Sequence, residues 1–165
     1  MLTALAVMAC GEKKEEKEQI TISDNSSTQS NGINSKAADK GEVVEVYISA
    51  SDQMQFGKNE IKVKAGSTVK LTLEHTGEMS ENVMGHNFVL LKQGTDISAF
   101  GQKAMQAADN DYIPEDEEQV IAHTEIIGGG ESTTIEFTAP ESGTYDFICS
   151  FPGHYAVMQG KFIVE

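Results

Sequence analysis

The sequence predicts an all-β sandwich of about eight strands with one inserted helix. Its 165 residues suffice for one ordinary domain, and 39% hydrophobic with 23% charged residues is a balance typical of globular proteins. Short runs rich in β-branched and aromatic residues recur along the chain, separated by turn-forming residues, as in sandwich folds. These runs occupy residues 43–48, 61–64, 68–73, 87–91, 120–126, 133–137, 144–149 and 161–164.

The predicted helix covers residues 97–108. This segment is rich in helix-forming residues and spaces Ile97, Phe100, Ala104 and Ala108 along one helical face. An acidic segment follows, which we expect to be a solvated surface loop. Calcium binding and partner docking are the alternatives, although the segment lacks EF-hand spacing. Its acidic residues are Asp109, Asp111, Glu115, Asp116, Glu117 and Glu118.

The N-terminal part of the sequence has a different composition from the rest. Residues 2–9 form an apolar run that ends in a small residue before Cys10, which resembles the lipobox of bacterial lipoproteins. The resemblance implies a signal-peptide remnant over 1–9 and a lipid anchor at Cys10, although no basic residues precede the run. A frayed N-terminus with an incidental cysteine is the alternative. Residues 10–42 are poor in bulky apolar side chains and predict a disordered tether, which leaves 43–165 as the folded domain.

The charge balance limits the kinds of partner. The chain has 26 acidic and 12 basic side chains, a net charge of −14, and every basic residue is lysine. After residue 42 there are 19 acidic residues and 7 lysines. Nucleic-acid binding depends on basic surfaces and is therefore disfavoured, whereas an acidic domain favours partners with positive patches. No run approaches the roughly 18 apolar residues of a membrane-spanning helix, so we expect membrane contact only through a lipid on Cys10.

Three residues with metal-binding side chains share one short segment near the C-terminus. Four residues separate Cys149 from His154, and three separate His154 from Met158. The segment lies between two predicted strands, and Pro152 and Gly153 allow it to fold back so that the three side chains converge. Thiolate, imidazole and thioether together suit copper, although zinc could use the same ligands.

One more imidazole would complete a His₂Cys trigonal site with a weak axial methionine. His86 lies on a bend after Gly85, directly before an apolar run, and is a natural candidate. A single cysteine, histidine or methionine is more often structural than a ligand. Three such residues on one loop, with a histidine at a strand edge, make a metal site the better hypothesis.

These segments resemble those of the azurins, small blue copper proteins of the cupredoxin family. The resemblance rests on residues 149–160 and 85–90, and extends to residues 52–56, 82–87 and 120–124. The four-then-three spacing favours azurins over plastocyanin-like relatives, whose Cys–His gap is shorter. The resemblance covers about 43–165 and implies a cupredoxin-like Greek-key sandwich or barrel with one inserted helix.

The resemblance also implies a role for each residue of the site. Cys149 would be the thiolate ligand, His86 and His154 the imidazole ligands, and Met158 the axial thioether. The backbone carbonyl of Gly85 would lie on the opposite axial side.

The same resemblance assigns supporting residues. Asn87 matches the residue that joins the two ligand segments by hydrogen bonds near the sulfur, and Phe151 matches a residue that packs beside the site. Met54 and Met84 match apolar residues of the surface patch around the exposed ligand histidine. We expect His154 to present its edge to a partner there.

Two features depart from the azurin pattern. The disulfide that azurins usually carry is missing, because Val44 and the 66–67 region occupy the corresponding places; Phe88 stands where many azurins have tryptophan. The remaining histidines match azurin residues that are not primary ligands. We expect His75 to be buried near the site and His123 to lie on the surface, both in structural roles.

The function implied is that of a type 1 copper electron-transfer protein of the bacterial envelope. It would shuttle single electrons between redox partners such as c-type cytochromes or a copper or haem reductase, as a monomer. We expect no enzymatic activity, since oxidases and reductases need further histidine clusters. A copper chaperone or storage protein is the alternative, but such proteins use clustered methionines or cysteines, whereas the methionines here are scattered. The location expected is periplasmic or cell-envelope, lipid-anchored through Cys10.

Overall fold

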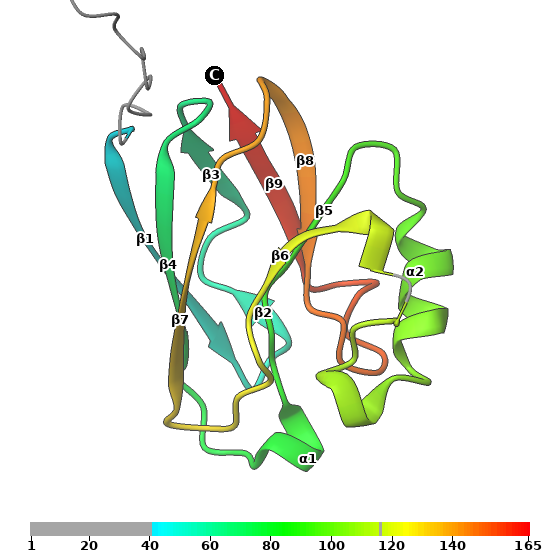
Figure 1. Ribbon diagram of the computed structural model, residues 1–165. Coiled ribbons are helices and arrows are strands. Elements are labelled where there is room, and N and C mark those ends of the chain that lie inside the picture. Colours follow the sequence, from blue (N-terminus) through cyan, green and yellow to red (C-terminus); the bar gives the residue numbers. More distant parts are fainter. Residues whose placement is uncertain (1–40, 116) are drawn as a thin grey trace, which may run out of the picture. The chain divides into compact units, whose positions relative to one another are not determined.

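A computed structural model describes residues 41–115 and 117–165 of the chain (Figure 1). The predicted signal remnant over 1–9, Cys10 and nearly all of the predicted tether over 10–42 lie outside the described residues. Among the described residues, no helix is both long and apolar enough to span a membrane.

Two mixed β-sheets make up the described fold. The four-stranded sheet has the order β2-β1-β4-β7, and the five-stranded sheet has the order β3-β9-β8-β5-β6. β1 pairs in parallel with β4, and β3 pairs in parallel with β9, while the other pairings are antiparallel. The strands are β1 (Val43–Ser51), β2 (Gln55–Phe56), β3 (Glu60–Val63), β4 (Thr68–His75), β5 (Val89–Leu91), β6 (Val120–His123), β7 (Ser132–Thr138), β8 (Gly143–Ile148) and β9 (Gln159–Val164).

The main core lies between the two sheets. The sequence of β4 shows how this core forms. Successive side chains of a strand point to opposite faces of the sheet, and every second residue from Val69 to His75 is buried. The buried cluster is built from aliphatic side chains and phenylalanines of both sheets, including Leu71, Leu90 and Phe147. The all-β sandwich prediction is confirmed. The described strands number nine because the two-residue β2, too short to leave a pattern in the sequence, pairs with the end of β1.

The inserted helix α2 (Ile97–Ala104) lies beside the five-stranded sheet (Figure 1), and a second, smaller core joins the two. β5 serves both cores, since Leu90 joins the main cluster while Val89 and Leu91 join the smaller one. The smaller cluster comprises Val89, Leu91, Phe100, Ala104, Ile113 and Ile148.

The helix is shorter than the predicted 97–108. It begins after Asp96, whose carboxylate accepts the Ala99 amide at 3.0 Å. It ends at Ala104, and the Ala107 amide turns to the Ala104 carbonyl at 2.9 Å. Ala108 is exposed and begins the short 3₁₀ turn η1 (Ala108–Asn110). The prediction ran too far because Ala108 is a good helix former, although the core that holds the helix ends at Ala104.

The segments that carry the candidate ligands lie at the ends of strands. The short helix α1 (Glu81–Met84) precedes β5, and the loop over 149–158 connects β8 to β9. A second 3₁₀ turn, η2 (Glu117–Gln119), leads into β6.

Candidate metal centre

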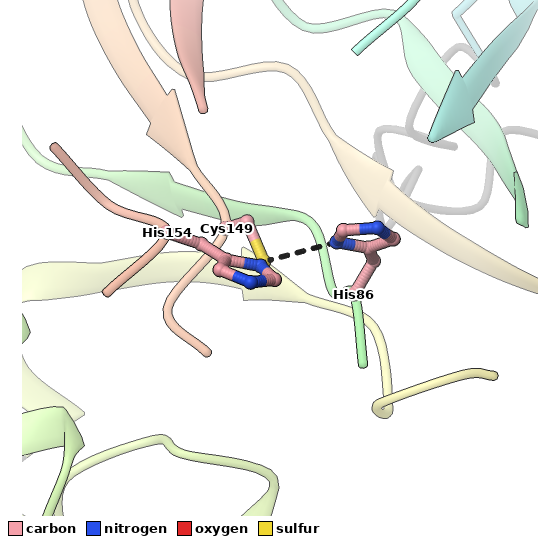
Figure 2. Close-up of side chains that lie close together, drawn as sticks. All are labelled: His86, Cys149 and His154. Atoms are coloured by element: carbon pink, nitrogen blue, oxygen red, sulfur yellow. Dashed lines mark hydrogen bonds between the residues drawn. The ribbon is translucent and has the colours of Figure 1, made fainter. Parts of the chain in front are cut away.

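One cysteine and two histidines converge at the end of β8 (Figure 2). Their side-chain donor atoms all lie within 4.8 Å of one another. The Cys149 sulfur is 3.8 Å from Nδ1 of His86 and 3.5 Å from Nδ1 of His154. A trigonal ion bound at about 2.0–2.3 Å would separate its ligand atoms by roughly 3.5–4 Å. Both sulfur–nitrogen distances fall in this range, so the three side chains fit around one ion.

His86 is held by hydrogen bonds to backbone atoms. Its own backbone forms an isolated bridge with Ile127, with N···O distances of 3.0 and 2.9 Å. Its ring Nε2 donates to the Ser51 carbonyl at 3.0 Å. Because a carbonyl only accepts, Nε2 carries the proton and Nδ1, which faces the sulfur, keeps its lone pair. This is the tautomer that a metal ion requires.

His154 is held chiefly by the turn that carries it and by aromatic packing. Its amide donates to the Phe151 carbonyl at 2.9 Å, and Gly153 supplies the positive φ of 83° that the turn needs. The His154 ring lies 4.7 Å from the Phe151 ring, centroid to centroid. Only 3% of His154 is exposed. The edge we expected it to present to a partner is therefore narrow.

Met158 and Gly85 complete the set of predicted site residues. Met158 is buried, and its backbone forms hydrogen bonds with two other predicted ligands. The Cys149 amide donates to its carbonyl at 3.0 Å, and its own amide donates to the His154 carbonyl at 2.8 Å. The Gly85 carbonyl lies 3.9 Å from the sulfur. A side chain at Gly85 would collide with the Glu81 carbonyl oxygen at 2.6 Å and crowd Ile126 and Phe151, so this position requires glycine.

Asn87 joins the two ligand segments. Its side-chain oxygen accepts the Ser150 amide at 2.9 Å, and its Nδ2 donates to the Ser150 hydroxyl at 2.8 Å. The same nitrogen donates to the Asp111 carbonyl at 2.8 Å. Asn87 and Ser150 are fully buried, so these bonds fix the residue after His86 against the residue after Cys149 in a place where water cannot substitute.

Burial sets the protonation of the three donors. Desolvation raises the pKa of the Cys149 thiol to about 12. Desolvation also lowers the pKa of both His86 and His154 to about 4, and the neighbouring His75 adds to the effect. Both imidazoles are therefore neutral near pH 7, ready to bind a cation. The thiol is protonated there and becomes a thiolate only when a bound cation compensates its charge.

The other two histidines do not join this group. His75 is fully buried; its Nε2 donates to Asp52 at 3.1 Å and its ring packs 4.5 Å from that of His86. Within the described part of the chain, His75 Nδ1 is the buried side-chain polar atom with no hydrogen-bond partner. His123 lies half-buried in β6, with Nδ1 3.2 Å from the Thr124 carbonyl.

The expectation of a fully solvated acidic loop is wrong at Asp111. This residue is half-buried, and its carboxylate accepts the Ile126 amide at 3.1 Å. Sequence reasoning also missed the carbonyl of Ser51 and the carboxylate of Asp52, which position the rings of His86 and His75. These contacts join residues far apart in sequence, and no local spacing marks them.

Comparison with known proteins agrees with this geometry. Residues 42–165 match the family model described as copper binding proteins, plastocyanin/azurin family. The chain is 42% identical over 119 residues to Azurin-1 of Alcaligenes xylosoxydans xylosoxydans, a match that covers 70% of this chain and 92% of that protein. It is 42% identical over 117 residues to outer membrane protein H.8 of Neisseria gonorrhoeae, covering 69% of this chain and 63% of that protein.

A solved structure gives the same result. Auracyanin A, a "blue" copper protein from Chloroflexus aurantiacus, superposes with a TM-score of 0.69 at 32% identity, covering 74% of this chain and 99% of that one. The predicted resemblance and the copper expectation are thus confirmed at the level of the family. The chain belongs to the plastocyanin/azurin family of copper-binding proteins.

Proposed function

We propose that the chain is a type 1 copper electron carrier with one metal ion. His86, Cys149 and His154 would be the principal copper ligands, and the Met158 thioether and the Gly85 carbonyl would be weaker ones. The observation that carries the proposal is the convergence of one buried sulfur and two imidazole Nδ1 atoms within 4.8 Å. The supporting roles of Asn87 and Phe151 belong to the same proposal.

The protein would serve electron transfer by keeping the ligands still. Copper, when bound, supplies one-electron exchange between Cu(II) and Cu(I). The backbone bridge at His86, the hydrogen bonds of Asn87 and the buried position of Met158 each restrain a ligand segment independently of the oxidation state. A site restrained in this way changes shape little on reduction, which favours fast transfer.

Copper delivery or storage is the less favoured function. A protein that hands over its metal needs ligands that a receiving protein can reach. Here Cys149, His86 and His154 are each no more than 3% exposed, and Met158 is 1% exposed. We therefore favour the carrier and assign the chain no enzymatic activity. Fast electron self-exchange would support the carrier, and rapid copper transfer to a metal-free acceptor would support delivery.

We propose that a redox partner with a basic surface docks beside His154, for example a c-type cytochrome or a copper or haem reductase. Exposed apolar side chains lie on three segments near the ligands: Met54 at 36%, Val83 at 62% and Val157 at 64%. Exposed acidic residues accompany them at Glu78, Glu81, Glu125 and Glu131. Small apolar contacts with charge complementarity are typical of short-lived redox encounters. Transfer rates to a basic cytochrome should fall with rising salt, and salt-independent rates would refute this partner class.

We further propose an envelope location with a lipid anchor at Cys10, residues 1–9 being a cleaved signal, 10–42 a tether and 43–165 the redox domain. The support is the lipobox-like sequence and the name of one relative, outer membrane protein H.8. Mass spectrometry of the mature protein should find Cys10 at the N-terminus with added lipid mass. An unmodified Cys10 would refute the lipid anchor. We expect the protein to be a monomer in detergent.

The copper proposal is tested with the Cys149→Ser variant. The oxidised, copper-loaded protein should show an intense blue thiolate-to-copper charge-transfer band, which Cys149→Ser should abolish. Cys10→Ser is the matched control, because it removes the chain's other thiol and should leave the band unchanged. A colourless Cu(II) protein, or a band that survives Cys149→Ser, would overturn the assignment.

A further inference from the structure

The inserted helix and the turn that follows it contact both ligand segments. We propose that residues 97–113, here called the brace, position the two imidazoles relative to Cys149. The positioning residues are Asp111 in the brace and Tyr155, which lies on the ligand loop and packs against the brace. This inference rests on the proposed copper site for its functional meaning. The contacts themselves belong to the metal-free protein and can be tested there.

Asp111 contacts the His86 side of the site at two points. Its backbone carbonyl accepts Nδ2 of Asn87 at 2.8 Å, and Asn87 directly follows the ligand. Its carboxylate accepts the Ile126 amide at 3.1 Å. The next residue, Ile127, forms the backbone bridge to His86. One aspartate therefore contacts both segments that form the bridge.

The brace reaches the His154 side through aromatic packing. Tyr112, the residue after Asp111, packs edge-on against Phe151 with the ring centroids 5.2 Å apart and the planes at 70°. Phe151 in turn packs against the His154 ring. Two adjacent residues of the brace thus contact the two ligand segments.

A second contact to the His154 side comes from the helix itself. Gly101 is buried within α2, and any side chain there would overlap the ring of Tyr155. Tyr155 directly follows His154 in sequence and packs against the small core under the helix. The ring occupies the space that Gly101 leaves, and this fixes the ligand loop against the helix.

The turn of the brace adopts an unfavourable backbone conformation. Asp111 has φ 50° and Tyr112 has φ 57°, and two consecutive non-glycine residues in this region are uncommon. Asn110 Nδ2 donates to the Ile113 carbonyl at 2.8 Å, and the Tyr112 amide donates to the Ala107 carbonyl at 3.0 Å. Such a conformation persists only where its surroundings impose it, as they do beside this site.

The first test uses metal-free protein and the reactivity of the Cys149 thiol, which is fully buried. In a full-length Cys10→Ser background, a thiol reagent reaches Cys149 only when the site opens. Asp111→Gly tolerates the positive φ but loses the carboxylate, so it should raise the labelling rate about tenfold, the usual effect of one lost hydrogen bond to a partly buried amide. Asp111→Asn keeps an acceptor oxygen and should label within about twofold of the parent.

The control for this test is Asp109→Gly, an exposed position in the same segment. It should label at the parent rate. Urea unfolding of each variant measures its loss of global stability, from which the increase in labelling rate that global unfolding alone would cause is calculated. If Asp111→Gly labels no faster than Asp109→Gly, or only as much faster as its loss of global stability requires, Asp111 is merely structural and the inference fails.

The second test uses copper-loaded protein. Gly101→Ala should displace the Tyr155 ring and shift the charge-transfer band, and Gly101→Ala combined with Tyr155→Ala should return the band to that of Tyr155→Ala alone. If Gly101→Ala does not fold, Tyr155→Ala alone should still raise the thiol labelling rate. An unshifted band in folded Gly101→Ala, or unchanged labelling in Tyr155→Ala, overturns the brace. Failure of the parent protein to bind copper would overturn the proposed function instead, while the thiol measurements would still decide on the brace.

Discussion

His86 and His154 both direct a ring nitrogen at the Cys149 sulfur, but the protein holds the two rings by different means. The His86 ring is tied by a hydrogen bond to the Ser51 carbonyl, and its backbone pairs with Ile127. The His154 ring has the packing of Phe151 beside it and lies on a loop. Hydrogen bonds fix a ring and its tautomer, whereas packing fixes its position and tolerates small adjustments.

The difference matches the tasks expected of the two residues. His86 is fully buried within the frame of the sandwich, whereas His154 is 3% exposed, on the loop that a partner would contact. A ligand held by side-chain packing can be tuned by substitutions in its loop without disturbing the sheets. A ligand held by backbone pairing can be changed only by altering the fold.

Acid should produce the largest effect, because it acts on both rings. Burial lowers the pKa of His86 and His154 from 6.5 to about 4 in the folded, metal-free protein. Between these two values the unfolded chain binds protons that the folded protein does not. The free energy of unfolding should therefore fall as the pH drops from about 6.5 to about 4. Urea unfolding of metal-free protein across this range measures the fall.

Ring proton shifts followed by NMR provide the check on each residue. Both imidazoles should stay neutral until the pH approaches 4. Ordinary titration near pH 6.5 by either ring, with no loss of stability, would contradict the burial of that ring. Titration of His154 well above His86 would instead show that packing excludes water less completely than the backbone frame does.

The fold and the ligand loop were predictable from the sequence, but the means by which the protein holds the two rings was not. The alternation in β4 predicts a half-buried strand, and the four-then-three spacing from Cys149 predicts a ligand loop. By contrast, the Ser51 carbonyl carries no side-chain signature, and Asp111 looks like one more acid in an acidic run. The pairing of Gly101 with Tyr155 is visible only when α2 and the ligand loop are seen packed together. Contacts of this kind depend on tertiary placement, which no local periodicity encodes.

Phe151→Leu should produce the next largest effect, on the His154 side alone. The substitution removes an aromatic ring that packs on both His154 and Tyr112. Smaller volume and lost ring pairing should cost about 1–2 kcal/mol of unfolding free energy in the metal-free protein. Water would reach the imidazole more easily, so the pKa of His154 should rise toward its ordinary value while that of His86 stays low. NMR titration and urea unfolding measure the two effects.

The matched control for this variant is Phe137→Leu in β7, where the ring is half-buried and packs against Phe162 at 5.9 Å. This variant should lose a similar amount of stability but leave the pKa values of His86 and His154 unchanged. Equal shifts of His86 and His154 in Phe151→Leu would mean that the two rings share one support, which would contradict the contrast between them.

Thr124→Val should produce the smallest effect on the ligands, although it removes hydrogen bonds on the His86 side. The fully buried Thr124 hydroxyl accepts the Phe88 amide at 3.0 Å and donates to the Glu125 carbonyl at 2.9 Å. Valine has a similar shape but leaves these groups unpaired, which should cost about 1–2 kcal/mol of unfolding free energy. The neighbouring backbone bridge between His86 and Ile127 does not involve the hydroxyl and should stay closed. The pKa of His86 and the charge-transfer band of the copper-loaded protein should therefore match those of the parent protein.

The matched control is Thr138→Val, at an exposed position at the end of β7, which should change stability by less than about 0.5 kcal/mol. A shifted band in Thr124→Val would mean that side-chain hydrogen bonds, and not the backbone pairing, determine where His86 lies.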